Sequence, residues 1–242
     1  MNVRVSNLST LLLFPALFIA EPMTAEAACS LTQYASLPVS YTASGLPEIQ
    51  VVVNGQQASM LLDTQSAFSL IDTDIANTLH IKTQALPPSN VKFGKQQVHS
   101  FATVPLTLEH LAYPHMEMLV AHLPEASTVG AAGVLGLDVF AGPDIDTEFD
   151  FGHNRIALFS SKHCKGMGPY WADRYAMVPL HRGDVHEYYF DMTLDGKKLE
   201  TMLATGATEA ALFTNVSKQL YGIDEYSTGI QIETDGPGSS SR

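Results

Sequence analysis

The sequence predicts a mostly β protein with one complete lobe and the beginning of a second lobe of the same kind. Apolar and polar residues alternate through many short segments separated by turn-forming residues, a pattern typical of strands with one buried face. In addition, residues 47–81 align with residues 188–222 without a gap, at a constant offset of 141 positions. A gap-free internal repeat predicts two copies of one structural unit.

Both copies of the repeat open with the pattern of a β-hairpin. Alternating segments at residues 47–53 and 188–194 end in the dipeptides Asn54-Gly55 and Asp195-Gly196. Such dipeptides favour two-residue hairpin turns because both positions tolerate a positive φ. A second strand, a turn of small residues, a short apolar strand and a brief helix complete each copy.

The brief helices have recognisable end signals. Thr73 and Thr214 stand where each helix begins, and we expect them to be the N-cap residues. Gly222 is expected to end the second helix because glycine adopts the left-handed conformation at low cost.

The remainder of the first lobe also has the spacing of β structure. Alternating segments lie within residues 91–108 and 116–123, and the run GAAGVLGLDVF occupies residues 130–140. A last hairpin is expected at residues 149–159, followed by a stretch that contains glycine and proline. The chain therefore divides into a first lobe at residues 28–165, a linker at 166–177 and a partial second lobe at 178–242.

The N-terminal residues 1–27 have the pattern of a secretory signal peptide. Arg4 precedes an apolar run at residues 11–20, and Ala25 and Ala27 form an A-x-A cleavage pattern. The apolar run is too short to span a bilayer, and the alternatives are a buried N-terminal helix and a lipoprotein site at Cys29. We expect a periplasmic or secreted protein with no membrane association after cleavage.

The charge of the chain restricts its partners. Lys and Arg total 13 against 25 Asp and Glu, which gives a formal net charge of −12. A surface that attracts nucleic acid or anionic membranes needs the opposite sign, so neither partner is expected.

One stretch of the first copy resembles a known family. The segment LLDTQSAFSLI at residues 61–71, followed by GVLGLDVF and FDFGHNRIAL, is similar to the bacterial retropepsin-like aspartic proteases. In that family an Asp-Thr/Ser-Gly turn is braced by a later apolar-apolar-Gly segment, within a closed β-barrel lobe. The resemblance covers about residues 45–160. It implies that Asp63 is catalytic, within a turn formed with Thr64, Gln65 and Ser66 and braced by Val134, Leu135 and Gly136.

The second copy of this motif lacks its acid. Two carboxylates that share one proton can activate a water and protonate an amide oxygen, because the two cannot both ionise at short range. At the offset of 141, Asp63 corresponds to Ala204, whereas Thr64 corresponds to Thr205. The departures are complementary, because the first copy has Gln65 where the family has glycine and the second copy keeps Gly206. The resemblance implies that the two threonine hydroxyls connect the two turns.

The second lobe is also incomplete in this sequence. The counterpart of Gly136 would fall at position 277, beyond Arg242. We interpret the chain as a fragment, or as one that needs strands from another chain. A partial β unit leaves strand edges open, so we do not expect residues 178–242 to be stable alone.

Three functional hypotheses follow. The first is an exported aspartic peptidase that hydrolyses peptide bonds with Asp63 and a second Asp supplied by a pairing lobe, most simply in a homodimer through the first lobes. The second is an inactive relative that binds peptides, and the third is an extracytoplasmic β-rich interaction module. In the first two the partner is a peptide or protein.

No cofactor or metal is expected, because the spacing of His110, His115 and His122 fits no common zinc pattern.

The two cysteines generate the first prediction. An exported chain meets oxidising conditions, and Cys29 and Cys164 are its only cysteines, so we expect one disulfide, with two unpaired thiols as the alternative. In the retropepsin-like fold the two ends of a lobe tend to lie together. A bridge would close a loop of about 135 residues and stabilise the protein by roughly 4 to 5 kcal/mol. Thiol labelling of the unreduced, denatured protein should find no free thiol, and labelled cysteines would contradict the pairing.

Overall fold

A computed structural model describes residues 31–87, 91–93, 96–162, 169–183 and 187–230. The expected signal peptide, Cys29 and Cys164 lie outside these ranges. Within them, no helix is long and apolar enough to cross a membrane.

The first lobe is a closed six-stranded β-barrel, which confirms the predicted fold class. Neighbouring strands pair in a continuous order, and β8 pairs back on β2 to close the circle. In barrel order the strands are β2 (Pro47–Val53), β3 (Gln56–Leu62), β10 (Gly133–Leu135), β4 (Leu70–Asp72), β9 (Leu111–Ala121) and β8 (Ser100–Leu108).

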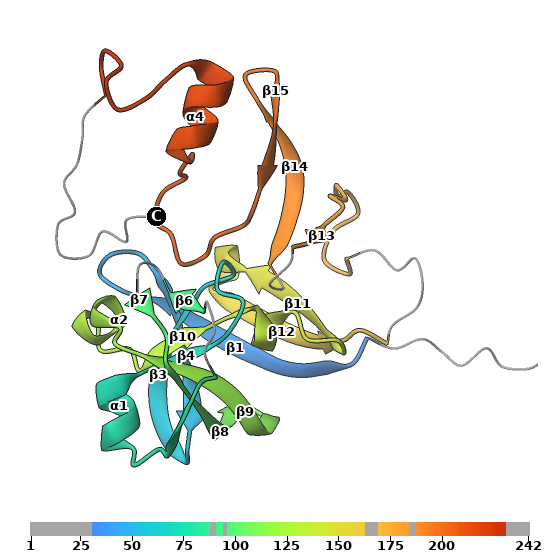
Figure 1. Ribbon diagram of the computed structural model, residues 1–242. Helices are drawn as coiled ribbons and strands as arrows, with labels where there is room; N and C mark the ends of the chain where they lie inside the picture. Colours follow the sequence, from blue (N-terminus) through green and yellow to red (C-terminus); the bar gives the residue numbers. More distant parts are fainter. Residues whose placement is uncertain (1–30, 88–90, 94–95, 163–168, 184–186, 231–242) are drawn as a thin grey trace, which may run out of the picture.

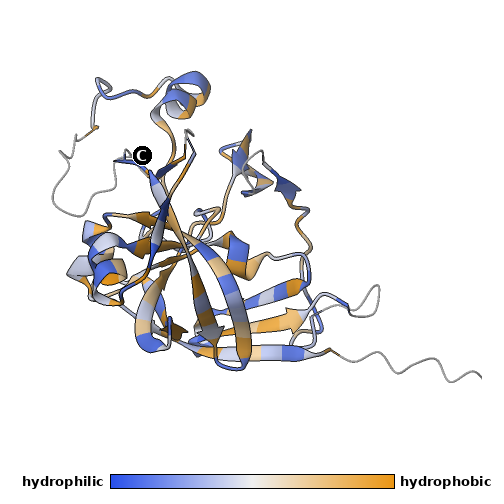
Figure 2. Cartoon of the chain, turned by 60° about the horizontal axis from the view of Figure 1, so that its bottom comes forward, coloured by the Kyte–Doolittle hydropathy of each residue, from blue (hydrophilic) through white to orange (hydrophobic). Residues whose placement is uncertain are grey.

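The alternation in the sequence places the core inside this barrel. In β2, Ile49, Val51 and Val53 are buried, whereas the side chain of Gln50 between them is exposed. The turn after β2 has the expected geometry, with φ of 48° at Asn54 and 80° at the following glycine. Figure 2 shows the resulting bands of apolar and polar residues along the barrel strands.

A three-stranded sheet continues from the barrel. The strand β1 (Gln33–Tyr41) pairs with β12 (Arg155–Ser160) through its first part and with β2 through its last part. The strand β11 (Ile145–Asp150) pairs with β12 and completes the sheet. The short elements of the lobe are α1 (Thr73–Thr78), α2 (Pro124–Thr128), α3 (Leu137–Phe140), η1 (Phe151–His153), β5 (Thr83–Ala85), β6 (Lys92–Phe93) and β7 (Gln96–Gln97).

The prediction for the helix N-caps was wrong by one residue. The N-cap of α1 is Asp72, whose Oδ1 accepts a hydrogen bond of 2.8 Å from the amide of Asp74, so Thr73 is the first helical residue. The carboxylate also accepts from the amide of Leu123 at 2.7 Å, a contact far along the chain that a local pattern does not reveal. Likewise Thr214 lies inside its helix rather than at the cap.

The second repeat contains β13 (His181–Arg182), β14 (Tyr188–Leu194), β15 (Lys197–Thr201) and α4 (Thr214–Tyr221). Figure 1 shows these elements as a separate group above the barrel. The hairpin β14–β15 has the register of β2–β3 shifted by 141 residues, since Leu194 pairs with Lys197 as Val53 pairs with Gln56. Gly222 ends α4 with φ of 69°, as predicted.

The register shows that the correspondence begins earlier than the sequence comparison indicated. His181 pairs with Tyr189 as Ser40 pairs with Glu48, again at the offset of 141. Carried back along the chain, this register places YASLPV at residues 34–39 over YAMVPL at 175–180. The stretch interpreted as a linker therefore overlaps the counterpart of β1.

Corresponding residues of the two copies differ sharply in burial. Leu37 is 2% exposed and Leu62 is fully buried, whereas their counterparts Val178 and Leu203 are 55% and 57% exposed. In the first lobe the strands β8 to β12 complete the barrel and the adjoining sheet around these positions. The described part of the second repeat has no counterparts of those strands.

We predict that the first lobe folds without the second repeat. A fragment of residues 31–162 keeps the closed barrel and should show cooperative thermal unfolding by circular dichroism. A fragment of residues 169–230 buries too little apolar surface to offset its conformational entropy and should lack dispersed amide signals in NMR spectra. A cooperative transition in the second fragment would contradict this division.

Candidate active site

The loop after β3 holds the carboxylate of Asp63 at the end of a barrel strand. Its backbone amide donates to the carbonyl of Leu135 at 3.0 Å, and the amide of Gln65 donates to its Oδ1 at 2.9 Å. The amide of Ser66 donates to the Asp63 carbonyl at 3.1 Å and closes the turn. Asp63 and Gln65 are both half-buried.

The expected brace lies directly against this turn. Val134 and Leu135 pair in parallel with Leu61 and Leu62 at the end of β3. The backbone of the next residue, Gly136, passes so close to the turn that a Cβ there would lie 2.6 Å from the Ser66 carbonyl oxygen and 2.8 Å from that of Phe68. Only glycine allows this approach.

A buried serine connects the turn and the brace, and the sequence analysis missed it. The hydroxyl of Ser69 accepts from the amide of Gly136 at 3.1 Å and donates to Oδ1 of Asp138 at 2.7 Å, while the Ser69 amide donates to Oδ2 at 2.7 Å. Burial raises the pKa of Asp138 above its ordinary value, and the hydrogen bonds from Ser69 partly oppose that shift. Burial also raises the pKa of Tyr113 to about 12, with a smaller contribution from the charge of Asp138.

Four hydrogen bonds connect the two turns of the repeat. The amide of Thr64 donates to the Thr205 hydroxyl at 3.0 Å, and the amide of Thr205 donates to the Thr64 hydroxyl at 3.2 Å. Each hydroxyl then donates to the carbonyl that precedes the opposite turn, Thr64 to Leu203 at 2.6 Å and Thr205 to Leu62 at 3.0 Å. Both threonines are buried. We call these four bonds the threonine bridge.

The bridge brings the degenerate second turn against the first. Gly206 faces the carboxylate of Asp63, because a Cβ on Gly206 would lie 2.5 Å from the carboxylate carbon. Ala204 occupies the position equivalent to Asp63 and contributes a methyl group. The structure thus brings the two turns together around the single acid Asp63.

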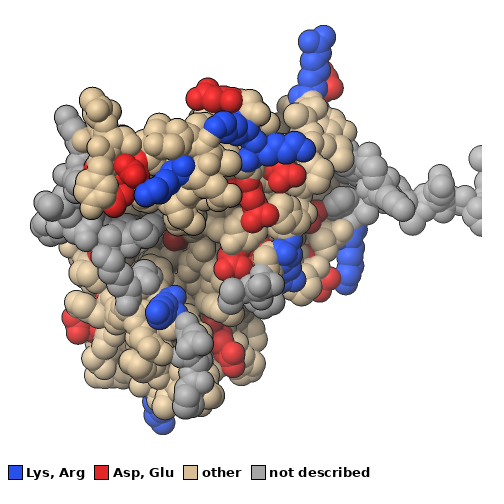
Figure 3. All heavy atoms as spheres, turned by 45° about the horizontal axis from the view of Figure 1, so that its top comes forward, with Lys and Arg blue, Asp and Glu red and all other residues tan. Residues whose placement is uncertain are grey.

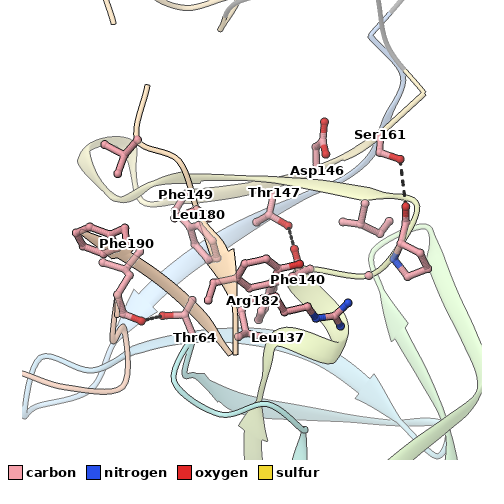
Figure 4. A pocket seen from close by; sticks show the side chains of 17 residues that line it. Thr64, Leu137, Phe140, Asp146, Thr147, Phe149, Ser161, Leu180, Arg182 and Phe190 are labelled. Carbon is pink, nitrogen blue, oxygen red and sulfur yellow. Dashed lines mark hydrogen bonds between the residues drawn. The ribbon is translucent and has the colours of Figure 1, made fainter. Parts of the chain in front are cut away.

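A cavity of about 820 Å³ lies beside the bridge, between α3 and β11 of the first lobe and β13 and β14 of the second repeat. Figure 4 shows Phe140, Leu180 and Phe190 around it, with the Thr64 hydroxyl bonded to the Leu203 carbonyl at its edge. The residues that line the cavity include Thr64 but not Asp63. The cavity is therefore separate from the carboxylate.

Comparison with known proteins agrees with this geometry. Residues 49–139 match the family model described as aspartyl protease. The matched residues lie within the first lobe, whose closed β-barrel is of the retropepsin-like kind. No curated protein matches the chain.

Two solved structures are similar to this chain over about half of its length or less. EIAV protease complexed with the inhibitor HBY-793 shares 22% identity over 42% of this chain and 90% of its own, with a TM-score of 0.33. A retropepsin-like aspartic protease from Rickettsia conorii shares 12% identity over 54% of this chain and 96% of its own, with a TM-score of 0.37.

The described residues contain no cluster suited to a metal ion. No group of three or more His, Cys, Asp or Glu residues within the described ranges could hold a metal ion. The cysteines lie outside those ranges, so the disulfide stays a prediction.

We predict that Gly136→Ala strongly destabilises the retropepsin-like lobe. The added methyl group would meet backbone atoms of the turn, which cannot move aside as a side chain can, and the expected cost is about 2 kcal/mol or more in the free energy of unfolding. Gly142→Ala is the matched control, since its Cβ would find its nearest atom at 3.6 Å. Chemical denaturation of both variants measures the difference. Equal stabilities would show that the close approach at Gly136 is unimportant.

Proposed function

We propose that the protein is an exported, non-hydrolytic member of the aspartyl protease family that binds extended peptides at the Asp63 turn. The observation that carries the proposal is the threonine bridge, which holds Ala204 in the place of the second acid. The scaffold of the two-acid site is present, and one of the two acids is absent from it.

The chemistry of peptide hydrolysis explains why one acid is too few. The reaction needs one group that takes a proton from the attacking water and another that supplies a proton to the amide oxygen. Two adjacent carboxylates supply both functions because they share one proton. Asp63 can serve as one of these groups, but the methyl group of Ala204 can neither donate nor accept a proton.

Binding requires less than catalysis. A half-buried carboxylate accepts hydrogen bonds from peptide amides, and charge-assisted bonds of this kind are stronger than neutral ones. The net charge of −12 favours peptides that are neutral or basic. On the face shown in Figure 3, acidic and basic side chains are interspersed rather than gathered into one basic patch, which supports a peptide rather than a nucleic acid as the partner.

A dimeric peptidase is the competing function. Pairing of two first lobes would bring two copies of Asp63 together through the same turn. In this chain the Thr64 amide and hydroxyl are already bonded to Thr205 and Leu203. The dimer would therefore form only after the second repeat left the first lobe, and this cost favours the non-hydrolytic function.

The test compares binding and cleavage in the mature chain from residue 28 onward. We expect no cleavage products by mass spectrometry from a mixed peptide library between pH 3 and 7, at low and high protein concentration. Fluorescence anisotropy should detect binding of basic library peptides, and Asp63→Asn should weaken it by roughly 10-fold or more because a charge-assisted bond is lost. The control Asp191→Asn removes an exposed acid of β14 and should leave the affinity unchanged.

Two outcomes would contradict the proposal. Cleavage that increases with protein concentration and disappears in Asp63→Asn would establish the dimeric peptidase. Absence of both binding and cleavage would favour the β-rich interaction module, whose repeat is purely structural.

A further inference from the structure

The two turns contact each other in reciprocal pairs. A Cβ on Gly206 would lie 2.5 Å from the carboxylate carbon of Asp63 and 2.8 Å from each of its oxygens. These three atoms are the nearest ones to that Cβ, so the carboxylate at position 63 is what restricts position 206 to glycine.

The same relation applies to the other pair of positions. The threonine bridge is reciprocal at the offset of 141, because each threonine amide donates to the hydroxyl of the other. The turns themselves also correspond, since Ser66 donates to the Asp63 carbonyl at 3.1 Å and Ala207 donates to the Ala204 carbonyl at 3.4 Å. This approximate two-fold relation exchanges Asp63 with Ala204 and Gly206 with Gln65. The Cβ of Gln65 is therefore directed toward Ala204, as the Cβ of residue 206 would be toward Asp63.

We propose that Gln65 replaces the missing acid: its side chain enters the space that a carboxylate at position 204 would fill, and its carboxamide and the Asp63 carboxylate together bind the backbone N–H and C=O of one residue of an extended peptide. The steric part of the proposal concerns the unliganded protein alone, whereas the binding part rests on the proposed function. A side chain at position 65 and an acid at position 204 exclude each other for lack of space.

The chemistry of this pair suits recognition of an extended peptide backbone that is not cleaved. The carboxylate accepts the N–H of one peptide residue, and the NH₂ of the carboxamide donates to the carbonyl oxygen of the same residue. The carboxamide has no proton to transfer near neutral pH, so it can orient the carbonyl but cannot protonate it. The ligand class is thus an extended peptide bound through its backbone.

A cycle of variants tests the steric part. Ala204→Asn introduces the shape of an acid without its charge, and it should lower Tm by roughly 3–8 °C in the otherwise unchanged chain because the added atoms overpack the site. In a chain that already carries Gln65→Gly, adding Ala204→Asn should lower Tm by less than half of that amount.

The reciprocal pair provides a matched control cycle. Gly206→Ala should destabilise the chain that contains Asp63, and much less so when it is combined with Asp63→Ala. Hydrogen exchange of the Thr64 and Thr205 amides reports opening of the threonine bridge. The exchange rate should rise most in the variants whose Tm falls most. If Ala204→Asn has equal effects with and without Gln65→Gly on both Tm and exchange, the steric coupling is overturned.

Gln65→Met tests the binding part, because it keeps the length of the side chain and removes its hydrogen bonds. We expect unchanged Tm and unchanged exchange at the threonine bridge, with affinity for the library peptides lower by roughly 3- to 10-fold. Equal affinity in Gln65→Met would overturn the role of the carboxamide. If the unmodified chain binds no peptide, the proposed function and the binding role of Gln65 both fail, while the stability cycle still decides the steric coupling.

Discussion

The threonine bridge is the interaction on which the arrangement of the two turns depends. Thr64 and Thr205 are buried, and each supplies an amide and a hydroxyl that would be costly to bury without a partner. Each group finds its partner on the opposite turn, so the four bonds form together and position two segments separated by 141 residues. That position brings Gly206 against Asp63, and the chemistry of the site follows from the contact.

The structure separates the requirements of the scaffold from those of catalysis. The bridge uses hydroxyl and backbone groups, and the brace depends on the close approach of Gly136 to the turn, so neither involves an ionised side chain. The methyl group of Ala204 therefore removes none of the bonds that connect the two turns. The arrangement of the turns does not require an acid at position 204.

The sequence predicted the local features of this structure better than the contacts between residues far apart in the chain. The hairpins and the end of α4 follow from alternation and turn dipeptides, which act within a few residues. The bond between Ser69 and Asp138 joins residues 69 positions apart and depends on barrel closure, so no local signal identifies it. The counterpart of β1 at residues 175–180 was missed because the glycine and proline residues just before it indicated a linker, although its register follows the repeat.

Equivalent sequences in the two copies show that burial is decided by neighbours rather than by pattern. Leu62 is fully buried and Leu203 is 57% exposed, although both precede the same turn. Full burial of a leucine side chain contributes roughly 1.5–3 kcal/mol, which the second repeat largely forgoes at this position. The second repeat is therefore held in place mainly by the threonine bridge and by the residues around the adjoining cavity, not by a core of its own. A contact with so little apolar burial behind it opens more readily than the barrel does. The contact of Gly206 with Asp63 is therefore less stable than the first-lobe turn and brace that hold Asp63 itself.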